Sequence, residues 1–161
     1  MSNIIDLAMR AGHALQERGL MLATAESCTG GGVAQAVTEI AGSSAWFERG
    51  FVTYSNAAKT EVLKVPEALI AQFGAVSEEV AGAMAKGAVM NSQACIALST
   101  TGIAGPGGAV PGKPVGTVCF GWANEHRSFT ERLVLAGDRQ AVREQAVAHA
   151  LQGLLRFLKE A

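Results

Sequence analysis

The sequence predicts an α/β protein, a sandwich of helices around a mostly parallel sheet of five strands. Short apolar runs alternate along the chain with amphipathic stretches of helical period, as units of strand and helix require. Loops rich in Gly, Ser and Thr follow three of the apolar runs. The last two runs are joined by residues 124–127 alone, which indicates a hairpin and therefore one antiparallel pair of strands.

The elements follow in order from these patterns. A first helix is expected over residues 3–18, and Gly19 is a natural stop for it. Its apolar residues share one face, namely Ile4, Ala8, Ala11 and Leu15. Strands are expected at 20–25, 50–54, 94–99, 115–123 and 128–135. Further helices are expected up to about residue 40, around Lys59, at 66–73, at 78–91 and from Asp138, which caps the last one.

The composition is typical of one globular domain over residues 1–161, with no repeat or linker. Hydrophobic residues make up 49% of the chain and charged residues 17%, and the net charge is −1. Because the basic residues form no cluster, a nucleic-acid partner is not expected. The three cysteines are odd in number and lack CxxC spacing, so neither a disulfide framework nor a zinc site is indicated. His13, His126 and His149 lie far apart in the sequence, so no metal site is expected.

The sequence also indicates a cytoplasmic protein without a membrane partner. Its first ten residues lack the basic start and apolar core of a signal peptide. The uncharged stretch Gly87–Pro111 is too polar and too broken by glycines to span a bilayer.

Three unusual segments each follow a predicted strand, and they contain Ser27, Ser55–Lys59 and Thr101–Gly108. Ligands bind at the carboxyl ends of the strands in an open α/β sheet, so these loops should meet on one rim. The start of the last helix, around Arg139, could reach the same rim.

Ser27 lies between a strand and a glycine-rich helix start, where free N–H groups would stabilise a developing oxyanion. It is therefore a candidate nucleophile, although the sequence is not GxSxG. Local spacing alone favours a simpler interpretation, in which Ser27 or Thr29 caps the helix. Cys28 is a competing nucleophile one residue away.

Lys59 is a candidate base. It falls in the first turn of its predicted helix, where the helix dipole disfavours its charged form. Tyr54, the only tyrosine, ends the preceding strand and could bond to the serine or the lysine. The alternative is a solvated surface lysine and a tyrosine packed at a strand end.

The remaining features are a glycine-rich loop and an arginine pair. The loop 101–108 is neither a dinucleotide fingerprint nor a Walker loop, and it could be a binding loop or a structural turn. Arg139 and Arg143 share a face near a helix N-terminus and could clamp a phosphate. On spacing alone the more common outcome is a solvated pair, with Arg143 paired with Asp138 or Glu144.

Several motifs together resemble the CinA C-terminal domain family. They are Thr24–Gly31 (TAESCTGG), Ala41–Asn56 (AGSSAWFERGFVTYSN), Gly74–Ser77 (GAVS), Thr101–Pro106 (TGIAGP) and Lys113–Val118 (KPVGTV). They occur in order over nearly the whole chain. The resemblance is to the stand-alone form of this domain, without the larger N-terminal domain of full-length CinA proteins.

The resemblance implies a three-layer α/β/α sandwich with a five-stranded mixed sheet, like the anticodon-binding domain. It also implies an amidohydrolase that converts nicotinamide mononucleotide and water to nicotinate mononucleotide and ammonia, in pyridine nucleotide salvage, without metal or other cofactor. Ser27 would attack, Lys59 would accept its proton, and Tyr54 would assist. The implied substrate-binding residues are Glu26, Thr29, Gly30, Thr101, Gly102, Gly105, Arg139 and Arg143. A nucleotide substrate and a homodimer are the implied partners.

One departure from the family pattern is the pair Ala109 and Val110, where a Ser or Thr often stands. A missing hydroxyl there would change substrate affinity. The rival function is a non-catalytic ligand-binding or interaction module linked to competence or recombination.

Overall fold

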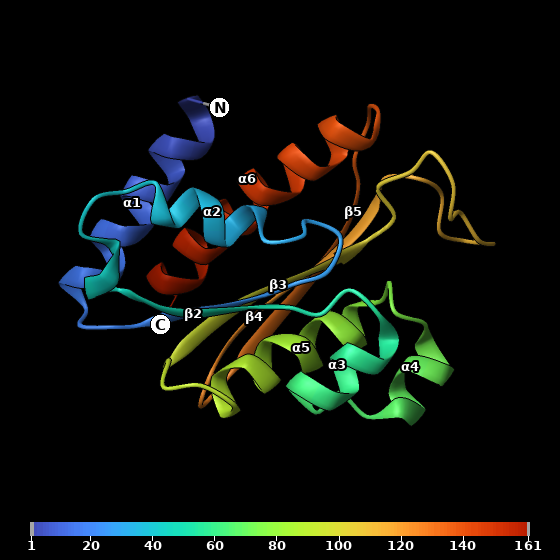
Figure 1. Ribbon diagram of the computed structural model, residues 1–161, viewed down its shortest axis with the longest axis horizontal. Coiled ribbons are helices and arrows are strands. Elements are labelled where there is room, and N and C mark those ends of the chain that lie inside the picture. Colours follow the sequence, from blue (N-terminus) through green and yellow to red (C-terminus); the bar gives the residue numbers. More distant parts are fainter. Residues whose placement is uncertain (1, 161) are drawn as a thin grey trace.

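The computed structural model describes residues 2–160, which form one open sheet covered by helices on both faces (Figure 1). The strands are β1 (Leu22–Glu26), β2 (Phe47–Val52), β3 (Ile96–Gly102), β4 (Thr117–Asn124) and β5 (Ser128–Val134). The helices are α1 (Ser2–Glu17), α2 (Gly32–Thr38), α3 (Asn56–Leu63), α4 (Glu67–Phe73), α5 (Glu78–Met90) and α6 (Arg139–Lys159), with a short 3-10 turn at Ser43–Ala45. All five predicted strands are present.

The sheet order is β2-β1-β3-β4-β5, with β1 parallel to both β2 and β3. The sequence predicted one antiparallel pair, and this was wrong, because β4 runs antiparallel to β3 as well as to β5. The segment between β3 and β4 contains no helix. It therefore cannot make the crossover that a parallel pair needs, and the chain returns beside β3 in the opposite direction.

Helices α1, α2 and α6 cover one face of the sheet and α3, α4 and α5 cover the other, which gives three layers (Figure 1). Every residue of β1 is buried, and its apolar side chains contribute to both apolar clusters. Leu22 packs with the α1, α2 and α6 side, whereas Ala23 and Ala25 pack with the α3, α4 and α5 side. Strand β1 is thus held from both faces, which fixes the position of the loop that follows it.

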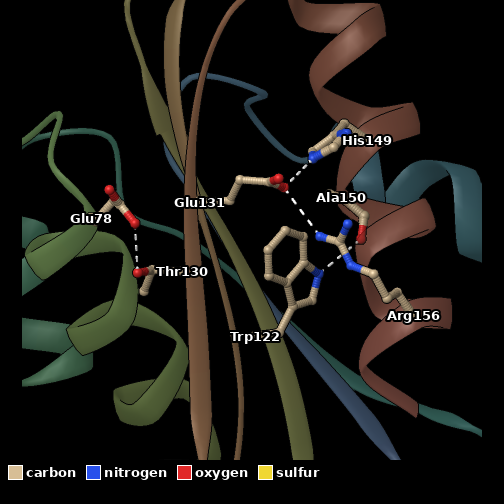
Figure 2. Close-up of polar contacts among 7 residues, drawn as sticks. All are labelled: Glu78, Trp122, Thr130, Glu131, His149, Ala150 and Arg156. Atoms are coloured by element: carbon tan, nitrogen blue, oxygen red, sulfur yellow. Dashed lines mark hydrogen bonds and ion pairs between the residues drawn. The ribbon is translucent and has the colours of Figure 1, made fainter. Parts of the chain in front are cut away.

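Helix α6 is attached to the sheet by side chains of β4 and β5 (Figure 2). The indole of Trp122 donates to the carbonyl of Ala150 at 3.0 Å. The carboxylate of Glu131 lies 2.6 Å from His149 Nε2 and 3.3 Å from Arg156 Nη2. On the other side of β5, Thr130 donates to Glu78 at the start of α5 at 2.8 Å. The buried Trp122 bond and the Glu131–His149 pair hold α6 against the sheet, and so place its N-terminal turn over the ends of β1 and β3. The Arg156 contact is half exposed and adds little to this attachment.

Among the helices of residues 2–160, none is both long and apolar enough to cross a membrane.

Candidate active site

A cavity of about 220 Å³ lies at the carboxyl ends of β1, β2 and β3. The segments around Ser27, Ser55–Lys59 and Thr101–Gly108 all reach it, as the sequence predicted, and residues 75–76 and the first residue of α6 complete it. The lining residues are Ser27, Cys28, Tyr54, Asn56, Lys59, Ala75, Val76, Thr101, Gly102, Ala104 and Arg139. Strand order reverses around β1, so the cavity is at the position where open α/β sheets bind ligands.

Ser27 directly follows β1 and is almost buried. Its backbone N–H donates to the carbonyl of Thr100 at 3.0 Å, which continues the pairing of β1 with β3. Its hydroxyl oxygen lies 3.0 Å from Lys59 Nζ. The contact joins the two residues that the sequence singled out as nucleophile and base.

Lys59 is 1% exposed, which is exceptional for a lysine. Ser55 caps α3 by accepting from the Ala58 N–H, and this places Lys59 at the end of the first turn. Besides Ser27, Nζ donates to the carbonyls of Thr53 and Tyr54, each at 3.1 Å. An ammonium has three N–H groups for these three oxygens. In the neutral amine, two N–H groups can stay on the carbonyls while the lone pair faces the serine hydroxyl.

Burial lowers the pKa of Lys59, because the charged amine loses its solvation inside the protein. The sequence predicted a shift in this direction but attributed it to the helix dipole. Among residues 2–160 no carboxylate bonds to Nζ, and both of its main-chain partners are neutral carbonyls. The lysine is therefore in surroundings that favour a neutral base.

Glu26 and Thr29 do not line the cavity, although the family resemblance implied that they bind substrate. The buried Glu26 carboxylate accepts from the N–H groups of Val33 and Ala34 at 2.9 and 3.0 Å, and from the Thr29 hydroxyl at 2.6 Å. The N-cap position of α2 is Gly31, without a side-chain bond. The alternative in which Ser27 or Thr29 caps the helix was therefore wrong. The first free N–H groups of α2 are occupied by Glu26 rather than directed at Ser27.

Tyr54 contacts the Ser27–Lys59 pair through its main chain. Its carbonyl accepts from Lys59 and lies 3.5 Å from Ser27 Oγ. Its side chain is 63% exposed at the cavity mouth, where the hydroxyl lies 3.3 Å from Arg139 Nη2. The expected bond from the hydroxyl to serine or lysine is not found in this structure.

The end of β3 and the loop that follows it form another wall. Thr101 is buried, and its hydroxyl donates to the carbonyl of Ala75 at 2.8 Å, so it joins two walls of the cavity. Gly102 lines the cavity, whereas Gly105 contributes a carbonyl that accepts from Arg139. Asn56, Ala75 and Val76 line the cavity although the sequence did not identify them as site residues, and the family motif at 74–77 had been given no function. Ser77, which caps α5, marks a turn before that helix and is the sequence signal that could have pointed to residues 75 and 76.

The two arginines of α6 separate in space. Arg139 lines the Ser27 cavity. Arg143 instead donates to the carbonyls of Cys28 and Thr29, at 3.2 and 3.4 Å, and lines a second pocket of about 310 Å³ between α1, α2 and α6. Gly30 is exposed and lies beside Arg143 rather than in the cavity wall. The predicted clamp of two arginines around one phosphate is therefore not assembled here.

Cys28 is a poor nucleophile in this position. Burial raises the pKa of its thiol to about 12, so the thiolate is scarce at neutral pH.

The departure from the family pattern at Ala109 and Val110 lies outside the cavity wall, in an exposed part of the long segment between β3 and β4. In the described part of the chain, residues 2–160, His, Cys, Asp and Glu form no cluster of three that could hold a metal ion.

Comparison with known proteins shows the family of this chain. The sequence matches the CinA C-terminal domain over residues 5–158. The chain belongs to this family. It is 54% identical to the nicotinamide-nucleotide amidohydrolase PncC of Pseudomonas putida, with 98% of each chain covered. It is also 54% identical to PncC of Escherichia coli strain K12, covering 95% of this chain and 93% of the relative.

Solved structures of the family have the same fold. The competence/damage inducible protein CihA from Agrobacterium tumefaciens is 43% identical, with a TM-score of 0.94 over 98% of this chain and 96% of that one. A CinA superfamily protein from Klebsiella pneumoniae is 39% identical, with a TM-score of 0.95 over 98% and 99% of the two chains. The mixed five-stranded sheet in three layers is therefore the family architecture.

Proposed function

We propose that this protein is an amidohydrolase that releases ammonia from the carboxamide of nicotinamide mononucleotide and leaves nicotinate mononucleotide. The observation that carries the proposal is the buried contact of 3.0 Å between Lys59 Nζ and Ser27 Oγ. The substrate is inferred from the PncC relatives, nicotinamide-nucleotide amidohydrolases that are 54% identical over nearly the whole chain. A buried serine and lysine in contact also favour catalysis over a purely ligand-binding or interaction module.

The reaction follows from the chemistry of these two groups. Neutral Lys59 takes the hydroxyl proton of Ser27 while Oγ attacks the amide carbon, giving a tetrahedral oxyanion. Lys59 then passes the proton to the leaving nitrogen, and ammonia departs from an acyl-serine ester. A water molecule, deprotonated by the same amine, attacks the ester carbon. The second tetrahedral intermediate then collapses, so that the Ser27 oxygen leaves and takes the proton from Lys59, and nicotinate mononucleotide is released.

The carbonyls of Thr53 and Tyr54 keep the amine directed at the serine through this cycle, because both remain acceptors whether the lysine is neutral or charged. Arg139 is the cation at the cavity mouth, so we assign it to the ribose phosphate of the substrate. Tyr54, whose hydroxyl lies beside Arg139, would border the same region.

The test is ammonia release from nicotinamide mononucleotide by the purified protein, followed with and without EDTA. We expect turnover that EDTA does not reduce, and much lower turnover of free nicotinamide, which lacks the group that Arg139 would bind. No ammonia from the mononucleotide at any pH between 6 and 10 would contradict the proposal. Activity that EDTA removes would contradict the Ser/Lys chemistry.

A further inference from the structure

The structure assigns to Arg143 a positioning role: its guanidinium binds the carbonyls of the Cys28–Thr29 and Thr29–Gly30 peptide bonds, and so holds in place the loop that carries the nucleophile and its neighbouring N–H groups. The inference rests on the proposed function in taking Ser27 as the nucleophile. It separates Arg143 from Arg139, which is assigned to the substrate.

The first observation is the position of the acceptors. Arg143 Nε donates to the carbonyl of Cys28 at 3.2 Å, and Nη2 lies 3.4 Å from the carbonyl of Thr29. These are the first two residues after the nucleophile. A planar guanidinium that spans two successive carbonyls fixes the orientation of both peptide planes, which one point charge cannot do. A Cβ on Gly30 would lie only 3.2 Å from Nη2, so the arginine also packs closely over this turn.

The second observation is which backbone donors remain beside Ser27. Its own N–H donates to the Thr100 carbonyl, and the Gly30 N–H donates to the Ser27 carbonyl at 3.1 Å. The first N–H groups of α2 are bound by Glu26. Among residues 2–160, the N–H groups of Cys28 and Thr29 donate to no other residue. The Thr29 N–H shares a peptide plane with the Cys28 carbonyl, so Arg143 sets its direction directly. The Gly30 N–H shares a plane with the Thr29 carbonyl and bonds the Ser27 carbonyl, which in turn shares a plane with the Cys28 N–H. Because Cys28 lines the cavity, its N–H is a backbone donor beside Ser27 for an oxyanion formed there.

The third observation is the backbone between Ser27 and α2. Gly30 and Gly31 both have positive φ, at 60° and 99°. This segment makes a tight turn that only glycine adopts without strain, and it has no packing side chain of its own at these two positions. The hydroxyl of Thr29, bonded to Glu26 and Thr100, holds the side-chain side of this turn. Arg143 holds its carbonyls from α6, the helix that Trp122 and Glu131 attach to the sheet.

The test compares Arg143→Gln and Arg143→Lys with the wild type, and uses Arg156→Gln as a control on the same helix. Nicotinamide mononucleotide is the substrate, and amide hydrogen exchange of the peptide over residues 22–33 is the readout that needs no activity. We expect both Arg143 variants to lose about 10- to 100-fold in kcat with little change in KM, since misplacing a nucleophile by about 1 Å has effects of this size. Exchange in the segment should rise in both variants and stay unchanged in Arg156→Gln, whose contact is with Glu131.

Arg143→Lys distinguishes the two roles. A lysine keeps the charge that a phosphate ligand needs but cannot span two carbonyls, so the positioning role predicts that kcat still falls. A rise in KM with kcat preserved, or a Lys variant equal to wild type, would overturn the inference. If the wild type releases no ammonia from the mononucleotide, the proposed function fails. Hydrogen exchange then decides alone, and unchanged exchange in folded Arg143→Gln would overturn the positioning role.

Discussion

The amine of Lys59 lies 3.0 Å from the hydroxyl oxygen of Ser27, although 32 residues separate the two in the sequence. The contact exists because β1 and β2 are parallel neighbours, so the loops that follow them emerge at the same edge of the sheet. The Thr53 N–H donates to the Glu26 carbonyl at 2.9 Å and extends this pairing as far as the residue before the nucleophile.

Replacing Ser27 with Ala should abolish ammonia release while the protein stays folded, because the alanine removes the attacking oxygen and adds no volume. Steady-state turnover and the thermal unfolding midpoint measure the two effects. Cys28→Ala is the matched comparison, since it removes the neighbouring heteroatom. We expect it to retain at least about a tenth of the activity, as a thiol with its pKa raised to about 12 is not the nucleophile. The opposite ranking of the two variants would assign the chemistry to Cys28.

Turnover should rise with pH as Lys59 loses its proton, with a midpoint below the ordinary lysine value because burial lowers its pKa. A pH profile of kcat/KM measures this. Lys59→Arg should have a kcat/KM at least about 100-fold below that of the wild type at every pH, since a guanidinium stays charged and cannot accept the serine proton. A flat profile for the wild type, or a rate for Lys59→Arg that approaches it at high pH, would exclude a lysine base.

The same pKa shift has a consequence for stability. The native state releases the Lys59 proton at a lower pH than the unfolded chain, so between the two pKa values the unfolded state binds more protons. The free energy of unfolding should therefore rise with pH in this interval. Lys59→Met avoids burying an amine, and we expect it to be more stable than wild type near pH 7 by about 1 kcal/mol. This advantage should shrink towards alkaline pH in denaturant titrations. A less stable Met variant at neutral pH would contradict this account.

Glu26→Gln should reduce kcat without raising KM, because the carboxylate holds α2 and Thr29 and does not line the cavity. A glutamine can keep one oxygen acceptor, but its NH₂ group would face an N–H donor of α2. The unsatisfied donor should lower stability by about 1–3 kcal/mol. Kinetics and thermal unfolding together test this. A large rise in KM with stability unchanged would restore the substrate-binding role that the family resemblance implied.

The sequence predicted most of the elements because their patterns are local. Gly19 follows the end of the first helix, and Asp138 caps the last one through the Ala141 N–H, as expected. The antiparallel direction of β4 was missed, because it depends on a segment between strands whose only signal was its lack of a helix. The first two connections between strands contain helices and join parallel neighbours of β1, whereas the last two contain none and give the antiparallel pairs.

The site divides in the same way. Ser27 and Lys59 could be predicted, since each lies just after a strand and the topology brings those loops together. The functions of Glu26, Tyr54 and Arg143 could not, because they depend on whether a side chain points into the cavity or away from it. Arg139 and Arg143 are four residues apart, yet one faces the cavity and the other faces the back of the nucleophile loop.

Gly153→Ala should displace the helix that carries both arginines. A Cβ at this position would lie 1.9 Å from Trp122 Cζ2, so either the indole or α6 must move. We expect a loss of about 1–3 kcal/mol in unfolding free energy, the usual effect of overpacking a core. Gly107→Ala is the matched control, because a Cβ there has no heavy atom within 4 Å. Equal stability of the two variants would show that the indole contact does not fix α6.

Arg139→Gln should raise the KM for nicotinamide mononucleotide by about 10- to 100-fold, the loss expected when a charge-assisted hydrogen bond to phosphate is removed. Its effect on kcat should be smaller, because the bonds of Arg139 are to Gly105 and Tyr54 at the cavity mouth rather than to the Ser27 loop. In the same assay, Arg143→Gln should lower kcat with little change in KM. The two arginines lie on one helix face, so any shared loss of helix stability would act on both variants alike. If Arg139→Gln changes mainly KM and Arg143→Gln mainly kcat, the difference must therefore come from what each guanidinium contacts. The same pattern of kcat and KM in both variants would refute the separate roles.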